Sequence, residues 1–332
     1  MDLVLVWTGL VGIVIIAYVV LDGFSLGVGL LFAFTPDEES RDVMMNAIAP
    51  VWDANQTWLV FGGGALFASF PTTYAVLFSA LYIPLMALII GLIFRGVAFE
   101  FRVNAKTSKR LWNRSFFIGS LVAVLAQGLT LGGYISGIRT ADAMFSGGAW
   151  DWLTPFSIMV ALGLTAGYML LGSTYLILKT TGQVQRRAYN RALTAAYVVG
   201  VFLIIVTIWT PVHEWRIFER WTSPPRVYYI WIFPLLGALS YGMLIRSIKK
   251  LSERLPFWCA VGVFLSAYVG LQAAVFPYAV LPDITIHQAA AQPKSLVFTL
   301  IGVCIILPVI LGYTAYSYWV FRGKVSAKDG YH

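Results

Sequence analysis

Residues 3–33 read LVLVWTGLVGIVIIAYVVLDGFSLGVGLLFA and contain a single charged side chain, that of Asp22. A helix needs about 20 apolar residues to cross a hydrocarbon core of about 30 Å. The run is long enough for that, and it exceeds the apolar part of a secretory signal. No Lys or Arg precedes Arg41, as the basic start of a signal would require. We therefore expect a retained membrane helix rather than a cleaved signal.

The composition of the whole chain agrees with this start. The 332 residues are 59% hydrophobic and 11% charged, and the mean hydropathy is +0.78. Soluble domains average about 45–50% apolar and about 25% charged residues. The net charge of +8 does not indicate a nucleic-acid partner, because the basic residues fall in short gaps between apolar runs. The sequence predicts one integral membrane domain over residues 1–332.

Further apolar runs give nine expected membrane spans in total. The alternating segments of about ten residues that mark a β-barrel do not occur. The expected fold is an all-α polytopic membrane protein. Its spans are placed at 3–33, 49–70, 74–96, 115–137, 154–178, 192–211, 227–246, 257–280 and 295–321.

The basic residues predict the orientation of these spans. Eighteen of the 23 Lys and Arg lie in or beside one set of alternate connections and the tail. The other five are Arg139, Arg216, Arg220, Arg226 and Lys294. Cytoplasmic connections carry the excess of Lys and Arg, so the N-terminus is expected outside and the C-terminus in the cytoplasm. An eight-span interpretation would break this alternation.

Two acids in the spans are candidate functional residues. A charged side chain at a helix centre costs about 2.5–3.5 kcal/mol on insertion scales, and such residues usually face a partner or a water path. Asp22 and Asp53 are both expected in the cytoplasmic half, where two carboxylates could carry protons inward. For Asp53 an alternative stays open, because an acid in the first turn of a helix also caps it or complements its dipole.

Four further residues stand near predicted boundaries. Arg95, Glu100 and Arg102 lie where the third span ends, and we expect ion pairs or snorkelling at the cytoplasmic edge. Trp58 belongs either to an interfacial aromatic belt or to the wall of a cavity.

The histidines and cysteines argue against a metal or haem site in this chain. His213, His287 and His332 all fall outside the expected spans, whereas a haem b in the bilayer needs an axial histidine on a helix. Cys259 and Cys304 lie in apolar runs without the spacing of a metal site. Any haem linked to this chain is expected in another polypeptide.

Several motifs resemble subunit II of cytochrome bd-type quinol oxidases. They are LDGFSLGVG at 21–29, NAIAPVWDANQTWL at 46–59, GGALFA at 63–68, FRGVAFEFR at 94–102, Phe276-Pro277 and PVILGYTAYSYW at 308–319. The segment 138–226 is short for this family, and in this respect the chain resembles the cyanide-insensitive branch.

The resemblance implies a bacterial plasma-membrane enzyme that oxidises quinol and reduces dioxygen to water, electrogenically and without pumping. It implies two four-helix bundles plus one peripheral helix for this subunit. The haems, two of type b and one of type d (or b in its place), would lie in subunit I, and small single-span subunits would join the pair. Some relatives hold a structural quinone or lipid in subunit II, but no motif here carries that over.

The resemblance also assigns roles to single residues. Asp22 and Asp53 match family acids on a proton route, and Trp58 matches a tryptophan near an oxygen route. Ser25 departs from the family, since many relatives have Asp there. Two other functions remain open from the sequence. One is a secondary transporter or channel, for which discontinuous helices in matching halves would be the sign. The other is a scaffold that conducts nothing.

Overall fold

The computed structural model describes residues 2–105, 107–213, 215–224 and 230–325, which are almost entirely helical. The helices are α1 (Leu3–Leu31), the 3-10 helix η1 (Phe32–Phe34), α2 (Glu38–Ile48), α3 (Trp52–Ser69), α4 (Pro71–Ala80), α5 (Tyr82–Asn104), α6 (Lys109–Ile135), α7 (Pro155–Lys179), α8 (Gly182–His213), α9 (Trp215–Thr222), α11 (Ile232–Lys249), α12 (Leu255–Val275), α13 (Ile286–Ala289) and α14 (Pro293–Val320). Two small antiparallel hairpins are formed by β1 (Thr140–Ala141) with β2 (Met144–Phe145) and by β3 (Tyr278–Val280) with β4 (Ile284–Thr285).

Within these ranges, nine helices have 18 or more residues, and seven of them are long and apolar enough to cross a membrane. The other two, α3 and α11, are 18 residues long. They are more polar, since α3 carries Asp53 and α11 ends with Arg246 and Lys249. The prediction of an all-α polytopic membrane fold is confirmed.

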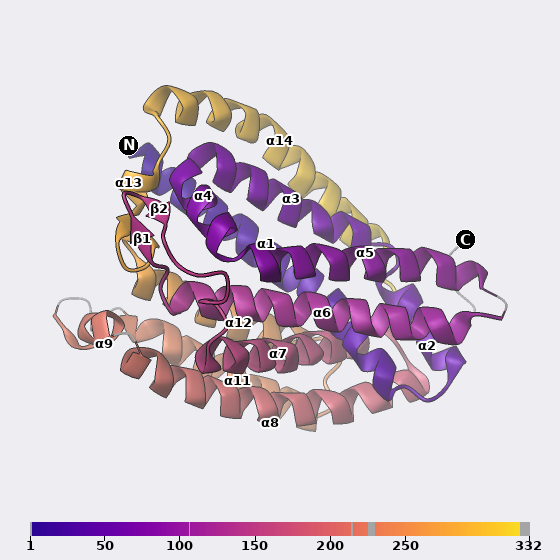
Figure 1. The fold of residues 1–332 in the computed structure, drawn as a ribbon. Helices are drawn as coiled ribbons and strands as arrows, with labels where there is room; N and C mark the ends of the chain where they lie inside the picture. Colours follow the sequence, from indigo (N-terminus) through magenta and orange to yellow (C-terminus); the bar gives the residue numbers. More distant parts are fainter. Residues whose placement is uncertain (1, 106, 214, 225–229, 326–332) are drawn as a thin grey trace.

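The long helices run roughly side by side in two sets (Figure 1). In the first set, α5 packs along α6, and α1 packs against α3 and α6. In the second set, α7 packs along α8 and α11 along α12. Helix α1 also packs against α7, which joins the two sets. Helix α14 lies on the outside against α3 and α1, on the opposite side of the molecule from α8.

The two ends of the bundle differ in charge. The end at which α5 terminates also carries α2 and the connection between α5 and α6 (Figure 1). There Arg187 of α8 pairs with Asp37, and Lys324 of the tail pairs with Glu253. The opposite end holds the N-terminus, both hairpins and α13.

The third expected span, 74–96, is wrong in its boundaries. The helix breaks at Leu81, and the membrane-spanning helix is α5, which extends to Asn104. Pro84 explains the break, because it has no N–H to bond the carbonyl of Ala80 four residues earlier. Because α5 continues to Asn104, Arg95 lies more than two turns inside this helix instead of at its end.

Close backbone contact between α1 and α7 places the centre of the molecule. A Cβ atom on Gly27 would lie 1.8 Å from the carbonyl oxygen of Tyr168, and one on Gly172 would lie 2.5 Å from the carbonyl carbon of Gly27. Small residues allow this approach of two membrane helices. The contact brings Tyr168 of α7 beside the turn of α1 that carries Asp22.

Candidate functional site

A charged pair lies inside the helix bundle. Arg95 of α5 donates from Nη1 to Asp22 Oδ1 of α1 at 2.8 Å, and both side chains are 0% exposed. Arg95 Nη2 donates to Ser25 Oγ at 2.6 Å, and Ser25 Oγ donates to Asp22 Oδ1 at 2.8 Å. Ser25 thus serves as a neutral bridge between the two charges.

Aromatic side chains enclose this pair. The Arg95 guanidinium lies 5.8 Å from the centre of the Trp52 ring, within the range of a cation–π contact. The Trp52 ring in turn stacks on Phe99 of α5, with 4.8 Å between ring centres. Burying two charges away from water is costly unless they are paired and hydrogen-bonded. Here Asp22 and Arg95 are paired with each other, and most of their polar atoms are hydrogen-bonded.

Two further hydrogen-bonded groups face the same acid. Tyr168 donates to Gln127 Oε1 at 2.7 Å, and Gln127 Nε2 donates to the Tyr18 hydroxyl at 2.8 Å. Tyr318 of α14 donates to Asn55 Oδ1 at 3.0 Å, and Asn55 Nδ2 donates to the carbonyl of Leu21 at 2.7 Å. All three tyrosines lie within electrostatic reach of Asp22. We call the following residues the Asp22 network: Tyr18, Asp22, Ser25, Asn55, Arg95, Gln127, Tyr168 and Tyr318.

Unused hydrogen-bonding capacity gathers in and beside this network. Asp22 Oδ2, Arg95 Nε, Gln56 Nε2 and Trp58 Nε1 are buried and have no hydrogen-bond partner among the described residues. An unsatisfied buried polar atom costs about 1–3 kcal/mol, and native structures keep few of them. Two of these atoms belong to the Asp22–Arg95 pair itself, which marks this pair as a place where protons and hydrogen bonds can be exchanged.

Asp53 and Trp58 occupy different environments from each other. Asp53 lies in the first turn of α3 with its side chain exposed, and the structure does not bring it into contact with Asp22. Trp58 is 2% exposed and packs in a small apolar cluster with Val14 and Tyr18. The position of Trp58 is therefore an interior one rather than part of a surface belt.

The expected cluster at the end of the third span must be corrected. Arg95 is an interior residue paired with Asp22, because α5 continues beyond the predicted boundary. Glu100 is exposed and forms no ion pair with a described residue. Of the three, Arg102 alone forms an ion-pair cluster at the end of the bundle.

The partners of Arg102 come mainly from α2, which lies across the basic end. Arg102 donates to Asp42 at 2.6 Å, to Glu38 at 3.0 Å and to Asn113 of α6 at 2.5 Å. Burial raises the pKa of Glu38, but hydrogen bonds from Asn113 and Arg41 and the charges of Arg41 and Arg102 outweigh it, so this pKa lies below its ordinary value. The helix is thus held by charges against the end of α5 and α6.

A second anchor of α2 lies on the other side of the same end. Arg187 donates to Asp37 Oδ2 at 2.6 Å, and Asp37 caps α2 by accepting from the backbone N–H of Ser40. The hydrogen bond from Arg187 holds the pKa of Asp37 well below its usual range, with further help from Ser40.

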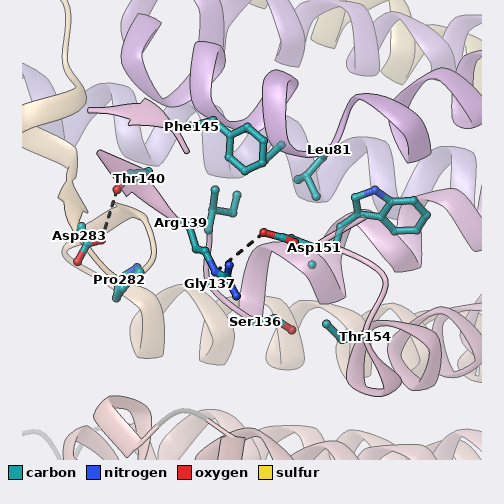
Figure 2. Close-up of a pocket in the computed structure, with 14 residues that line it drawn as sticks. Leu81, Ser136, Gly137, Arg139, Thr140, Phe145, Asp151, Thr154, Pro282 and Asp283 are labelled. Carbon is teal, nitrogen blue, oxygen red and sulfur yellow. Dashed lines mark hydrogen bonds and ion pairs between the residues drawn. The ribbon is translucent and has the colours of Figure 1, made fainter. Parts of the chain in front are cut away.

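A cavity of about 490 Å³ opens at the opposite end of the bundle (Figure 2). Its wall includes Arg139, which lies 4.0 Å from Asp151, and Thr140, which donates to Asp283 at 3.3 Å. The Arg139 side chain is 80% exposed. None of the residues selected from the sequence lines this cavity, and the candidate site is the Asp22 network.

The described residues contain no group of three or more His, Cys, Asp and Glu that could hold a metal ion. His287 Nε2 lies 2.9 Å from Asp2 Oδ2 in an exposed pair at the end of the bundle where α1 begins. The side chain of His213 and the whole of His332 lie outside the described residues.

Sequence reasoning missed Tyr18, Gln127 and Tyr168, and it missed that Arg95 pairs with Asp22. A signal for the pair was present, since a basic residue and an acid in spans of the same half are expected to meet. For the tyrosines and the glutamine there was only the general rule that buried polar groups find partners. Which groups meet is decided by how α1, α6 and α7 rotate against one another.

Comparison with known proteins agrees with this architecture. Residues 3–321 match the family described as cytochrome bd terminal oxidase subunit II. Relatives include the cytochrome bd-I ubiquinol oxidase subunit 2 of Escherichia coli (strain K12), 30% identical over 98% of this chain and 95% of the relative. Another is the cytochrome bd ubiquinol oxidase subunit 2 of Bacillus subtilis (strain 168), 30% identical over 97% of both chains.

A solved structure shows the same fold. The structure of the bd oxidase from Geobacillus thermodenitrificans contains a chain that matches with a TM-score of 0.74 at 14% identity, over 96% of this chain and 99% of that one. Because the identity is low, this match supports the fold alone. The family assignment comes from the sequence matches over nearly the whole chain. The chain belongs to the cytochrome bd terminal oxidase subunit II family and is thus a subunit of a quinol:oxygen oxidoreductase.

Proposed function

We propose that this chain is the haem-free subunit of its oxidase and that the Asp22 network carries protons from the cytoplasmic end toward the oxygen-reducing site of the partner. The observation that carries the proposal is the fully buried Asp22–Arg95 pair, in which one carboxylate oxygen has no described partner. Intramembrane ionisable residues of this kind mark ion and proton paths.

The direction of transfer follows from the distribution of charge. The end of the bundle that carries Arg102, Arg187 and Lys324 is the basic one, and the positive-inside rule makes it cytoplasmic. The N-terminus is then periplasmic. Reduction of dioxygen to water consumes protons, and taking them from the cytoplasm makes the reaction electrogenic without a pump.

Asp53 supplies the surface position of this route. Its carboxylate is exposed in the first turn of α3. Asn55, two residues further along, donates to the carbonyl of Leu21, the residue before Asp22. The same face of α3 exposes Val60 and Phe67. An acid at the start of an exposed face that becomes apolar further along suits a contact with a second membrane subunit that continues the path.

The partner is the haem-bearing subunit I in a hetero-oligomer of the bacterial plasma membrane, with room for small single-span subunits. Haems b and d, or b in place of d, belong to that partner. The described residues of this chain offer an arginine-paired aspartate and tyrosines inside the bundle, which suits proton handling rather than haem ligation.

Trp58 is assigned to an oxygen route. It is a buried aromatic residue surrounded by Val14 and by Leu307 and Ile310 of α14. An apolar path between α1, α3 and α14 would admit dioxygen and exclude charged species.

The experiment uses the whole oxidase complex with Asp22→Asn and Asp53→Asn. Both variants are expected to slow quinol-driven oxygen consumption while the haem content per complex stays normal. Asp283→Asn, at the opposite end, is the matched control and should leave turnover unchanged. Normal turnover of both variants in fully assembled complex would refute the proton route and leave a scaffold.

A further inference from the structure

Gln127 gives the hydrogen bonds beside Asp22 a direction. An amide oxygen can only accept, and an amide nitrogen can only donate. Because Tyr168 donates to Gln127 Oε1, the Gln127 amide nitrogen is left to donate to the Tyr18 hydroxyl oxygen. Tyr18 therefore keeps its own hydroxyl hydrogen, and its interaction with Asp22 is longer than a direct hydrogen bond.

The free acceptor closest along the helix is Asp22. Tyr18 and Asp22 are four residues apart on α1, so their side chains lie on the same face, and both are buried. Asp22 Oδ1 already accepts from Arg95 and Ser25, whereas Oδ2 has no hydrogen-bond partner. The Tyr18 hydroxyl interacts with the Asp22 carboxylate across this turn.

We propose that Gln127 is a positioning residue that directs the Tyr18 hydroxyl hydrogen toward Asp22 Oδ2. Both oxygens of the carboxylate then face a donor, Arg95 and Ser25 on one side and Tyr18 on the other. The inference rests on the proposed function of Asp22 and adds Gln127 and Tyr18 to it. Gln127 touches neither the acid nor any substrate and acts only through Tyr18.

The other groups that face Asp22 do not duplicate this role. They are Arg95 of α5, Tyr168 of α7 and Tyr318 of α14. Tyr168 uses its hydrogen on Gln127, and Tyr318 uses its hydrogen on Asn55. Tyr18 is the one tyrosine of the network whose hydrogen is uncommitted among the described residues.

The test is a double-mutant cycle in the assembled oxidase with Gln127→Met and Tyr18→Phe. Methionine has the length of glutamine but gives no orienting hydrogen bond. A carboxylate with fewer donors holds a proton more tightly, so each variant should move the alkaline limb of the pH–turnover profile to higher pH. The expected shift is about one pH unit, the size that follows from one hydrogen bond to a charged group. The double variant should shift the limb no further than either single variant.

Tyr134→Phe is the matched control. It removes a half-buried tyrosine hydroxyl on the same helix as Gln127, where this hydroxyl donates to the carbonyl of Ala279 at 3.3 Å. The pH profile of this variant should equal that of the parent. Haem content, from reduced-minus-oxidised spectra, is measured for every variant to confirm assembly.

Three results would overturn the inference. One is an unshifted alkaline limb for Gln127→Met in assembled enzyme. The second is an additive shift in the double variant, which would show that the two residues act separately. The third is an unshifted limb for Tyr18→Phe, which decides the matter if Gln127→Met fails to assemble. Asp22→Asn distinguishes failure of this inference from failure of the proton route. If Asp22→Asn slows turnover while the alkaline limbs of Gln127→Met and Tyr18→Phe stay unshifted, the inference alone fails. If Asp22→Asn turns over normally, the proton route fails as well.

Discussion

Arg95 and Asp22, 73 residues apart in the sequence, form a 2.8 Å ion pair in which neither side chain is exposed. The pair connects α5 to α1, a helix that packs against members of both sets of the bundle. It therefore has a structural consequence as well as a chemical one, and the two can be separated by mutation.

We expect Arg95→Gln to destabilise the subunit strongly, because it leaves a buried aspartate without its counter-charge. Removing one partner of a buried pair costs about 3–5 kcal/mol, whereas replacing both is often close to neutral. Asp22→Asn combined with Arg95→Gln should therefore recover most of the lost stability but not the turnover. Thermal release of haem from the purified complex measures the first effect and oxygen consumption the second. A double variant as unstable as Arg95→Gln would show that the charges are not coupled in this way.

Packing of α1 on α7 should tolerate no side chain at Gly27. Alanine there would place its Cβ 1.8 Å from a backbone oxygen, which no side-chain movement can relieve. Ordinary overpacking of a core costs about 1–3 kcal/mol of stability. The cost of this substitution should be larger, and the yield of assembled complex should fall sharply. Gly63→Ala is the control, since nothing lies within 4 Å of a Cβ at that position. Equal yields of the two variants would contradict the close contact.

The attachment of α2 should depend on pH through Asp37. Its pKa is lowered in the folded protein by the hydrogen bond from Arg187, so its contribution to stability is present above the pKa of an unfolded aspartate, about 4. That contribution is lost as pH falls through the lower, folded value. The protection of the α2 amides against hydrogen exchange, corrected for the intrinsic exchange rates, should stay constant between pH 7 and 5. It should weaken only below about pH 4.

Arg187→Gln is the matching variant for α2. Without the arginine, Asp37 loses the main cause of its lowered pKa, so the α2 amides should be less protected at pH 7 and should lose less protection below about pH 4 than in the parent. Unchanged protection at pH 7 and an unchanged loss on acidification would mean that α2 is held by Arg102 and its partners alone.

The oxygen route makes a kinetic prediction for Trp58. Trp58→Phe changes the size of a buried apolar side chain between α1, α3 and α14. We expect kcat/KM for dioxygen to change while kcat at saturating dioxygen stays the same. Trp150→Phe, at an exposed residue of the end opposite the basic one, should alter neither constant. A change in kcat alone for Trp58→Phe would assign the residue to structure or proton transfer instead.

The sequence was sufficient for the membrane fold because long apolar runs and the placement of Lys and Arg are strong signals. It failed at Leu81, where an uninterrupted apolar run concealed a break that Pro84 causes. The predicted span also ended at residue 96, whereas α5 continues to Asn104, and this second error placed Arg95 at the membrane edge and concealed its pairing with Asp22. Asp22 itself was found because a single acid in an apolar run stands out.

The positions of Tyr18, Gln127 and Tyr168 could not be predicted in the same way. Each is an ordinary residue in its own span, and they meet because Gly27 and Gly172 let α1 and α7 touch. Contacts of this kind depend on the rotation of each helix about its axis, which apolar runs without strong periodicity do not define.

The most direct test of the account is time-resolved electrogenic proton uptake by the oxidase in proteoliposomes, comparing the parent with Asp22→Asn during the reaction with dioxygen. The proton route predicts that the voltage phase due to proton uptake slows several-fold, while electron transfer between the haems of the partner keeps its rate. A normal uptake phase in a variant with full haem content would contradict it, and Asp22 would then serve only to hold α1 against α5.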